Sequence, residues 1–287
     1  MPSPKPDAAP DTATDFADFE PPLQYSRFER ASEGVAQLTL DRPDKNNAFN
    51  AQMIGELIAV FDRVAVSETI RVLVLAAAGR AFSAGGDIAW MRAQADLTEN
   101  ENEADALQLA TMLRKLDQLP QFTLALVQGA ALGGGLGLIA ACDYVCAIQS
   151  ANFRFSETRL GLTPATISPF VIAKIGAGHA RALFTSAAPF HARDALAIGL
   201  VHRLCMDETE LAAAGAQAVQ FALEGAPGAI RDCKELVADV AGRRIDQALS
   251  QMTAQRIAKR RASAEGQEGL KAFLERRSAA WAPKPAN

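Results

Sequence analysis

The chain has 287 residues, of which 49% are hydrophobic and 22% charged, and its formal net charge is -4. This length is enough for one large globular domain or one domain with a helical extension. The negative net charge argues against nucleic-acid binding through overall charge. No uninterrupted apolar run reaches about 18 residues, so we expect no membrane-spanning helix.

The cysteines and the first residues of the chain indicate where the protein works. No histidine or second cysteine pair completes a zinc-binding set, so we expect no metal and four reduced, buried thiols in a cytoplasmic protein: Cys142, Cys146, Cys205 and Cys233. Residues 1–24 are rich in proline, aspartate and alanine and lack the basic and apolar regions of a signal peptide. We therefore expect a disordered tail over residues 1–24.

Strand-like and helix-like segments alternate along the next part of the chain. Residues 35–40 alternate apolar and polar side chains and predict a strand, and Asn50 is placed to cap the helix that follows. Three continuous apolar runs predict buried strands at residues 72–77, 122–127 and 144–148. Apolar side chains at helical spacing predict another helix with a buried face formed by Leu107, Leu109, Met112, Leu113 and Leu116.

This alternation predicts an α/β fold with parallel strands joined by right-handed crossovers. After about residue 208 the pattern becomes helical, with helices expected at residues 211–223, 229–240 and 245–262. These segments are rich in alanine and need a surface to pack against, which we expect to be another subunit. We therefore divide the chain into a core at residues 25–208 and a helical oligomerisation region at residues 209–287.

Two glycine-rich stretches, residues 81–87 and 129–137, each follow a predicted strand and lead into a predicted helix. Glycine inside a helix costs about 1 kcal/mol relative to alanine, so four glycines within residues 133–137 need a reason. One reason is close packing of a helix on a sheet. The other is the approach of a ligand to free backbone N–H groups at a helix N-terminus, where the partial positive charge favours an anion.

A dinucleotide-binding site is an alternative for the second stretch. Residues 135–140 fit the pattern G-x-G-x-x-A, and Glu157 follows at a suitable distance. That fingerprint needs its first glycine directly after the strand, whereas here residues 129–134 intervene. We favour a different interpretation, in which each glycine-rich loop contributes one backbone N–H to an oxyanion hole.

The two loops together resemble the signature segments of the crotonase (enoyl-CoA hydratase/isomerase) superfamily. Residues 41–43 and 47–50 resemble its N-terminal loop that contacts coenzyme A, and residues 268–277 resemble its C-terminal helix. The resemblance extends from about residue 25 to Trp281. It implies a spiral of βαβ units with a C-terminal helical trimerisation region, assembled as a trimer or a dimer of trimers. It also implies an acyl-CoA thioester substrate, with coenzyme A as part of the substrate and no separate cofactor.

The resemblance further implies which residues form the site. Ala84 and Gly134 are expected to donate their backbone N–H groups to the thioester oxygen, and Glu157 is the expected acid–base residue. Phe273 and Arg276 match the place where relatives hold the adenine and phosphate of coenzyme A, commonly across a subunit boundary. The residues expected to contact the substrate are Lys45, Ala48, Ala81, Gly85, Asp87, Ile88, Gly133, Gly137, Phe273 and Arg276.

The sequence departs from the common hydratase pattern at one position. Ordinary enoyl-CoA hydratases carry a first glutamate where this chain has Gly137, and Glu157 matches their second glutamate. Residues 155–169 resemble the methylglutaconyl-CoA and carboxygeranoyl-CoA hydratase branch, and Ile167, Ser168 and Pro169 stand where typical hydratases have a glycine pair. We expect a hydratase of branched or carboxylated enoyl-CoA, in which a carboxyl group of the substrate could use the space that Gly137 opens.

Other functions remain open at this stage. A single carboxylate also suits a double-bond isomerase or a decarboxylase on the same fold. RNA binding is an alternative of another class, because a basic run at helical spacing is formed by Arg256, Lys259, Arg260 and Arg261. The run lacks interleaved aromatic residues, and the chain is acidic overall, which favours a solvated helix face over a nucleic-acid site.

Overall fold

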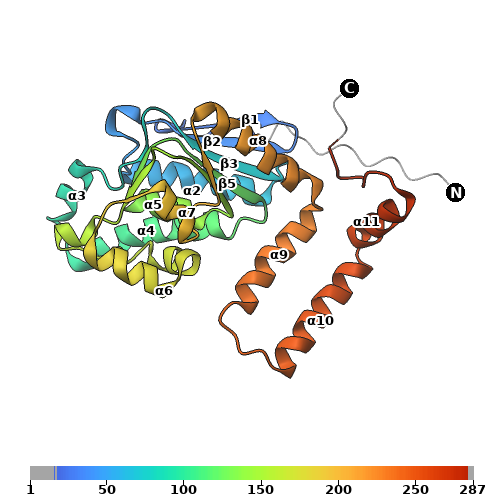
Figure 1. The fold of residues 1–287 in the computed structure, drawn as a ribbon. Helices are drawn as coiled ribbons and strands as arrows, with labels where there is room; N and C mark the ends of the chain where they lie inside the picture. Colours follow the sequence, from blue (N-terminus) through green and yellow to red (C-terminus); the bar gives the residue numbers. More distant parts are fainter. Residues whose placement is uncertain (1–15, 17, 284–287) are drawn as a thin grey trace.

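The computed structural model describes residue 16 and residues 18–283, and Figure 1 shows its fold. Most of the predicted tail, residues 1–15 and 17, lies outside the described residues. The part of it that is described packs on the first strand: Phe16 stacks on Phe28 with ring centroids 5.3 Å apart, and Phe19 meets the same ring edge-on at 6.1 Å. The packed part of the chain therefore begins before residue 25.

Two β-sheets form the centre of the molecule. The larger has the strand order β1-β2-β3-β5-β7-β10, in which only β1 and β2 pair antiparallel, and the smaller has the order β4-β6-β8-β9. The predicted strands at residues 35–40, 72–77, 122–127 and 144–148 are confirmed. The strands are β1 (Ser26–Ser32), β2 (Val35–Leu40), β3 (Val72–Ala77), β4 (Ala81–Ser83), β5 (Phe122–Val127), β6 (Ala130–Leu132), β7 (Tyr144–Ile148), β8 (Asn152–Arg154), β9 (Phe190–His191) and β10 (Arg203–Cys205).

The chain winds through the two sheets as a spiral of similar turns. Each turn gives a longer strand to the larger sheet, a short strand to the smaller one and then a helix: β3, β4 and α3 in the first turn, β5, β6 and α5 in the second, β7, β8 and α6 in the third. The predicted α/β spiral is therefore confirmed. Because every turn repeats the same path, the segments that follow β4 and β6 lie side by side at one edge of the small sheet.

The helices pack around this core according to their apolar faces. Asn50 caps α2 by accepting a hydrogen bond from the Met53 N–H at 2.9 Å, as predicted. In α4 the C-terminal half is buried, whereas Leu107 is 60% exposed because the N-terminal half extends away from the core. The helices are α2 (Ala51–Val66), α3 (Ile88–Gln94), α4 (Glu99–Asp117), α5 (Gly134–Ala141), α6 (Ser168–Ser186), α7 (Ala192–Ala197), α8 (Glu208–Glu224), α9 (Pro227–Val240), α10 (Gln247–Ala262) and α11 (Ala264–Glu275), with short 3-10 helices η1 (Pro43–Lys45) and η2 (Glu157–Leu160).

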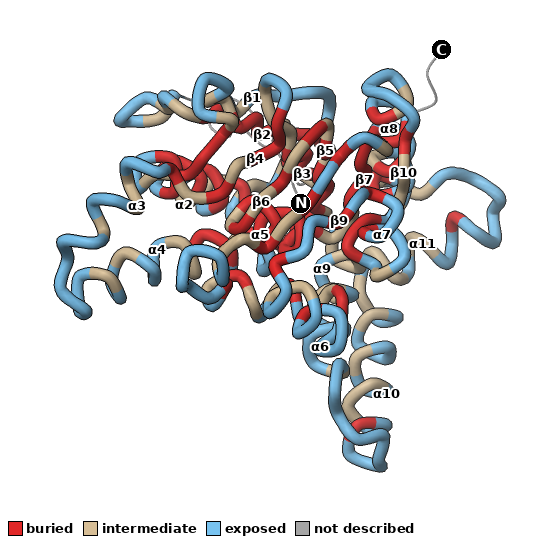
Figure 2. Tube along the Cα trace, turned by 60° about the vertical axis from the view of Figure 1, so that its left-hand side comes forward, coloured by how far each residue is buried: buried red, intermediate tan, exposed pale blue. Residues whose placement is uncertain are grey.

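The C-terminal helices do not all belong to one region. Helix α8 buries its apolar face against the large sheet, so it is part of the core. Helix α9 buries no residue, and α10 and α11 bury one each. Figures 1 and 2 show α9 and α10 projecting from the body as an arm with a largely exposed surface. The division between core and arm therefore falls after Glu224 rather than after residue 208.

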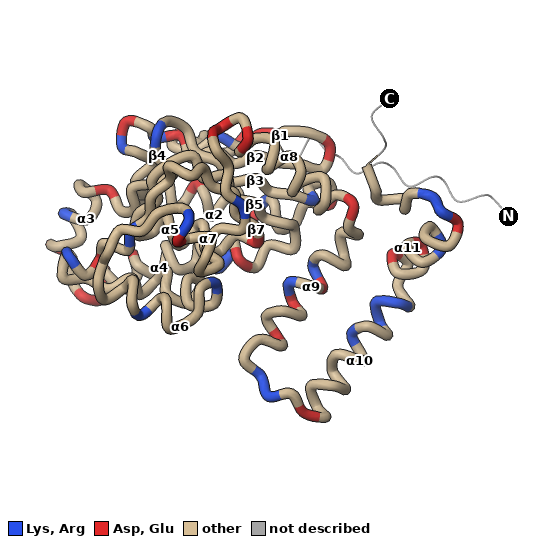
Figure 3. The backbone as a smooth tube through the Cα atoms, viewed as in Figure 1, with Lys and Arg blue, Asp and Glu red and all other residues tan. Residues whose placement is uncertain are grey.

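Ion pairs hold the two long helices of the arm together, and Figure 3 shows their charged residues. Arg260 on α10 contacts Asp232 on α9 at 2.8 Å, and Arg256 pairs with Asp239 one turn further along the arm. Two members of the basic run therefore neutralise carboxylates of the same chain. This pairing reduces the positive charge that an RNA-binding face would need.

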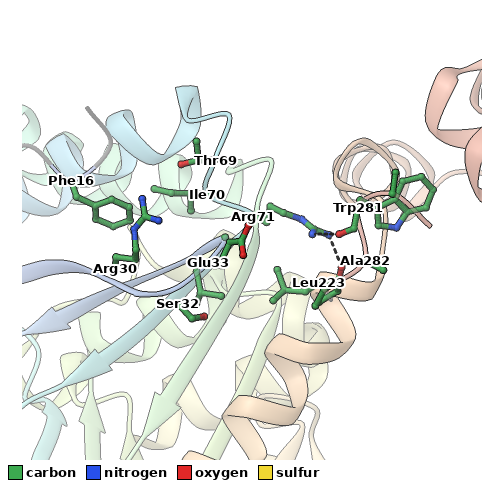
Figure 4. Close-up of a pocket in the computed structure, with 14 residues that line it drawn as sticks. Phe16, Arg30, Ser32, Glu33, Thr69, Ile70, Arg71, Leu223, Trp281 and Ala282 are labelled. Carbon is green, nitrogen blue, oxygen red and sulfur yellow. Dashed lines mark hydrogen bonds between the residues drawn. The ribbon is translucent and has the colours of Figure 1, made fainter. Parts of the chain in front are cut away.

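Arg71 connects the core to the C-terminal segment. Its guanidinium donates to the carbonyl oxygens of Leu223 at 2.7 Å and Trp281 at 2.6 Å, residues that Figure 4 labels. It also donates to the Gly225 carbonyl oxygen at 2.7 Å. Arg71, Leu223 and Trp281 line a cavity of about 530 Å³, and none of the residues expected in the active site lines it. Main-chain carbonyls accept most of the hydrogen bonds that Arg71 can donate. We therefore interpret Arg71 as a structural connection between the core and the C-terminal segment.

The four thiols are all free, but their environments differ. Cys142, Cys146 and Cys205 are buried as predicted, and burial raises the pKa of Cys142 to about 12 and that of Cys146 to about 11. The prediction of a buried thiol is wrong for Cys233, which is exposed because α9 buries no side chain. None of the helices among residues 18–283 is long and apolar enough to cross a membrane.

Candidate active site

The loop of residues 41–49 forms the foundation of the site through Asn47. This side chain is fully buried and donates from Nδ2 to the carbonyl oxygens of Ala78 and Ala81 at 2.8 and 2.9 Å. Its Oδ1 accepts from the Arg42 N–H at 2.8 Å, and its carbonyl oxygen accepts from the Ser83 hydroxyl at 2.9 Å. Asn47 thus fixes the path of the first glycine-rich loop at both ends of β4, through its side chain at the start and its main-chain carbonyl at the end.

The two glycine-rich loops come into direct contact, as predicted. Gly85 has φ +82°, and a Cβ added there would lie 2.9 Å from the Leu132 carbonyl oxygen and 3.5 Å from the Gly134 nitrogen. A side chain at residue 85 would therefore be strained by its backbone angle and would push the second loop away. The close approach of Gly85 brings the backbone of residues 84–86 beside the first residue of α5.

The structure does not leave the Ala84 N–H free for a substrate. That group donates to the Asn46 carbonyl oxygen at 2.9 Å, so the predicted role of Ala84 as an oxyanion donor needs correction. Phe49 pairs with Gly86 in a parallel bridge, in which the Gly85 carbonyl and the Asp87 N–H face Phe49. The Gly86 N–H points to the other side, and no acceptor for it exists among the described residues.

Gly134 is the first residue of α5, and its N–H belongs to the first turn, where no carbonyl of the helix can accept it. Leu136 donates to the Gly133 carbonyl, so the helix starts directly at the second loop. The glycine run fits both explanations offered for it from the sequence, close packing and a free N–H group. A Cβ added at Gly135 would lie 2.8 Å from the Cβ of Ser83, which is close packing, while Gly134 presents a free N–H.

Glu157 reaches the same place from η2. A Cβ added at Gly133 would lie 3.1 Å from Oε1 of Glu157, so the carboxyl group lies against the loop that begins α5. Its other oxygen, Oε2, is buried and has no hydrogen-bond partner among the described residues. Burial raises the pKa of Glu157, and the N–H groups of Glu157 and Ser156 offset part of that shift. A half-buried carboxylate with one buried, unused oxygen beside a helix N-terminus is suited to proton transfer.

Asp87 fixes the C-terminal end of the first glycine-rich loop, where α3 begins. It caps α3 by accepting from the N–H groups of Ala89 and Trp90 at 2.7 and 3.2 Å, and it contacts Arg42 at 2.7 Å. Burial raises the pKa of Asp87, but these hydrogen bonds and the arginine outweigh burial and lower it overall. Asp87 is therefore a fixed anion that supports the loop, and its predicted contact with the substrate stays a prediction.

The expected space beside Gly137 is filled. A Cβ added at Gly137 would lie 2.6 Å from Cγ2 of Ile167 and 3.1 Å from Cδ1 of Leu113, both of which are buried. The conjecture that a carboxyl group of the substrate occupies this place is wrong in this structure. Gly137 lies behind the loop, covered by Ile167.

The other predicted substrate contacts divide into three groups. Ala48 and Ala81 are buried in the foundation of the site. Lys45 and Ile88 are exposed at its edge, Ile88 by 73%. Phe273, which is 81% exposed, and Arg276 lie at the end of α11, remote from the two loops within one chain (Figure 1). Contact of these two residues with coenzyme A in a neighbouring subunit stays a prediction.

Three residues important to the site were missed from the sequence: Gly86, Asn47 and Ile167. Gly86 adjoins a predicted donor, and the alternation of N–H directions along an extended loop could have identified it. Asn47 lies in a turn of polar residues that gives no sign of burial. Ile167 lies in the segment where typical hydratases have a glycine pair. That difference is a usable signal, because a side chain that replaces glycine must be accommodated by space elsewhere, here beside Gly137.

Comparison with known proteins agrees with this geometry. The pattern of the family described as enoyl-CoA hydratase/isomerase matches residues 30–284. A crystal structure of an enoyl-CoA hydratase from Shewanella pealeana is 40% identical, covers 95% of this chain and 100% of its own, and superposes with a TM-score of 0.88. Pseudomonas aeruginosa AtuE is 36% identical, covers 91% of this chain and 100% of its own, and has a TM-score of 0.86.

A relative with a different named reaction is also similar. The mitochondrial Delta(3,5)-Delta(2,4)-dienoyl-CoA isomerase of Dictyostelium discoideum is 27% identical over 264 residues, which cover 88% of this chain and 90% of that protein. Matches of this length include both the spiral core and the C-terminal helices. The chain therefore belongs to the enoyl-CoA hydratase/isomerase family, the crotonase superfamily that its two glycine-rich loops indicated.

Proposed function

We propose that the protein is an enoyl-CoA hydratase, in which the Gly86 and Gly134 N–H groups hold the thioester oxygen and Glu157 transfers the proton. The observation that carries this proposal is the buried Oε2 of Glu157, which lacks a partner and lies beside the start of α5. A buried carboxylate oxygen left there without a hydrogen bond has no evident structural role.

The proposed reaction needs only one carboxylate. Glu157 takes a proton from a water molecule, whose oxygen forms a bond to the β-carbon of the enoyl group. The electron pair of the double bond moves into the thioester, and the resulting enolate oxygen is stabilised by the two N–H groups and the N-terminus of α5. The protonated Glu157 then gives the same proton to the α-carbon. Water is added across the double bond, and Glu157 returns to its starting state.

The raised pKa of Glu157 supports this role. A more basic carboxylate removes a proton from water more readily and returns it to carbon less readily, so a value nearer neutrality serves both steps. Backbone donors at the oxyanion contribute separately, and loss of one such donor costs about 100- to 1,000-fold in rate in other enzymes.

An enoyl-CoA isomerase is the second candidate, because Gly137 leaves the site with one carboxylate. A single base can remove a proton from one carbon of an acyl chain and return it to another through the same enolate. The Dictyostelium relative is named as an isomerase of this chemical type. A decarboxylase would use the same hole without a base, so the unpartnered oxygen of Glu157 does not favour it.

Incubation in isotopically labelled water separates these reactions. The protein is supplied with crotonyl-CoA, methylglutaconyl-CoA and a β,γ-enoyl-CoA, and the products are analysed by mass spectrometry. A hydratase yields a β-hydroxyacyl-CoA that carries one labelled oxygen. Isomerisation of the β,γ-enoyl-CoA without oxygen uptake, together with no reaction of either α,β-enoyl-CoA, would overturn the hydratase proposal in favour of the isomerase.

We also propose that the protein acts as a homo-oligomer, a trimer or a dimer of trimers, in the cytoplasm. The arm supports the first point, because α9 and α11 expose apolar side chains that include Val237, Leu270 and Leu274. In such an assembly Phe273 and Arg276 would meet coenzyme A bound to a neighbouring subunit. The four free thiols are consistent with a reducing compartment. Light scattering of the purified protein tests the assembly.

A further inference from the structure

Phe49 contacts both of the loops that carry the proposed oxyanion donors. Its N–H donates to the Gly85 carbonyl oxygen at 2.7 Å, and its carbonyl oxygen accepts from the Asp87 N–H at 2.8 Å. These two hydrogen bonds hold the chain on either side of Gly86 and turn the Gly86 N–H away from Phe49. The main chain of Phe49 therefore sets the direction of the first donor.

The side chain of Phe49 packs on the second donor. A Cβ added at Gly134 would lie 3.0 Å from both Cδ2 and Cε2 of the Phe49 ring, which is closer than ordinary van der Waals contact. The ring therefore lies directly against the first residue of α5. Because close-packed interiors transmit strain, a displaced ring would move the start of α5 and the Gly134 N–H with it.

Phe49 is itself anchored along the chain on both sides. Two residues before it, the Asn47 side chain donates to two main-chain carbonyls, and the next residue, Asn50, caps α2 by accepting from the Met53 N–H at 2.9 Å. The Phe49 side chain is 1% exposed and belongs to the main hydrophobic core. A buried ring on a chain that is held at both ends has little freedom, so its contacts with both loops are in place before a substrate binds.

We propose that Phe49 is a positioning residue of the oxyanion hole, which fixes the Gly86 N–H through its main chain and the Gly134 N–H through its ring. Its buried side chain acts through these two groups rather than on the substrate. The inference rests on the proposed function, because it concerns the same hole, and it applies to hydration and isomerisation alike, since both pass through an enolate. Stabilisation of an enolate should depend on the Phe49 ring more than binding of an unreactive thioester does.

The first test compares two thioesters that differ in the charge they place in the hole. Acetoacetyl-CoA loses a proton from its α-carbon to give an enolate, whose ultraviolet absorbance reports the apparent pKa of the bound ligand, whereas butyryl-CoA binds with a neutral thioester oxygen. Wild type, Phe49→Leu and the control Phe61→Leu are titrated with both. Phe61 on α2 is also fully buried, and the atoms nearest to a Cβ added at any glycine of the two loops come from other residues, so its truncation matches the loss of packing.

Phe49→Leu should raise the apparent pKa of bound acetoacetyl-CoA by about one unit, equivalent to about ten-fold weaker stabilisation of the enolate. Complete loss of an oxyanion donor costs about 100- to 1,000-fold, and a displaced donor keeps part of its effect. Binding of butyryl-CoA should weaken much less, because a neutral oxygen gains less than an anion from two N–H groups. Phe61→Leu should leave the apparent pKa of the bound ligand as it is in wild type.

The outcomes separate this inference from the proposed function. If wild type binds neither thioester, or does not lower the pKa of acetoacetyl-CoA below that of the free thioester, both are overturned. A wild-type effect that persists in Phe49→Leu, or is lost equally in Phe61→Leu, overturns only the role of Phe49. Equal weakening of the two thioesters in Phe49→Leu also overturns it, because the damage would then be general. If a leucine variant does not fold, the pair Phe49→Met and Phe61→Met loses less packing and should differ in the same direction by less.

The second test needs no ligand. Gly134→Ala places a Cβ against the Phe49 ring and should lower the melting temperature of the otherwise unchanged chain. In the Phe49→Leu background, which lacks the Cε2 atom, the same change should have a smaller effect, since residues in contact do not contribute additively. Equal effects of Gly134→Ala in the two backgrounds would show that the Phe49 ring does not hold residue 134.

Discussion

Replacing Glu157 by glutamine removes the proposed base and changes little else in size. General acid–base catalysis contributes about 100- to 10,000-fold, equivalent to about 3 to 5 kcal/mol of activation free energy. Because Ile167 fills the place beside Gly137, a second carboxylate there cannot take over the proton transfer. We therefore expect a loss in kcat in the upper part of this range, about 1,000-fold or more, with binding of butyryl-CoA nearly unchanged.

The same substitution should stabilise the fold at neutral pH. Burial raises the pKa of Glu157 in the folded chain, so the ionised form is disfavoured there relative to the unfolded chain. This destabilisation is fully present above the folded pKa and is lost as the pH falls toward the unfolded value, about 4.3. Glu157→Gln should therefore raise the melting temperature near pH 7 and lose that advantage in acid.

Two assays and one control variant test the role of Glu157. Hydration of the best substrate is followed across pH, and the rate of the wild-type protein should fall as the pH drops through the raised pKa of Glu157. Glu103→Gln, on the exposed face of α4, should change neither rate nor stability. A Glu157→Gln protein with lower thermal stability and full activity would refute the reasoning, since Glu157 would then be a structural group.

Three further substitutions, with Asp62→Asn as a control, test the framework of the fold. Asn47→Asp exchanges the amide that donates to two carbonyls for an acceptor, and should lower the unfolding free energy by roughly 2 to 4 kcal/mol in urea titrations. Asp143→Asn breaks a mostly buried ion pair with Lys234 that connects α9 to the core, and should lower the free energy of unfolding by roughly 1 to 3 kcal/mol. Asp62→Asn breaks a more exposed ion pair and should lower it by under about 1 kcal/mol. Arg71→Ala removes three hydrogen bonds to main-chain carbonyls and should lower the free energy of unfolding by roughly 2 to 4 kcal/mol. It should also speed proteolysis of the C-terminal segment. An unchanged cleavage rate would contradict the role of Arg71 in connecting that segment to the core.

The fold could be predicted from the sequence because its signals are local. The apolar runs at β3, β5 and β7 lie at the residues where the structure has strands, and the cap at Asn50 begins α2 as expected. Assignment of α8 to the arm failed for a reason that periodicity cannot reveal. Helices α8 and α9 are both amphipathic, and only the tertiary structure shows that α8 covers the sheet while α9 buries nothing.

The site could be located but not resolved in detail. The glycine loops and Glu157 were identified, and the structure brings Gly85, Gly133, Gly134 and Glu157 together. The choice between the N–H groups of Ala84 and Gly86 depends on which of them the neighbouring Asn46 carbonyl already takes. A contact of that kind joins residues that are distant in sequence, so composition and spacing carry no trace of it.

The arrangement divides the work between backbone and side chains. Because the proposed oxyanion donors are main-chain N–H groups, their position depends on the packing that holds the loops, to which Asn47 and Gly85 contribute. A substitution of Glu157, the proposed proton-transfer group, can then change the chemistry without disturbing these N–H groups. A scaffold with fixed polarisation of the thioester and exchangeable neighbours can support hydration in one member and isomerisation in another. For this chain the contact of Ile167 with Gly137 limits the choice to reactions that a single carboxylate can complete.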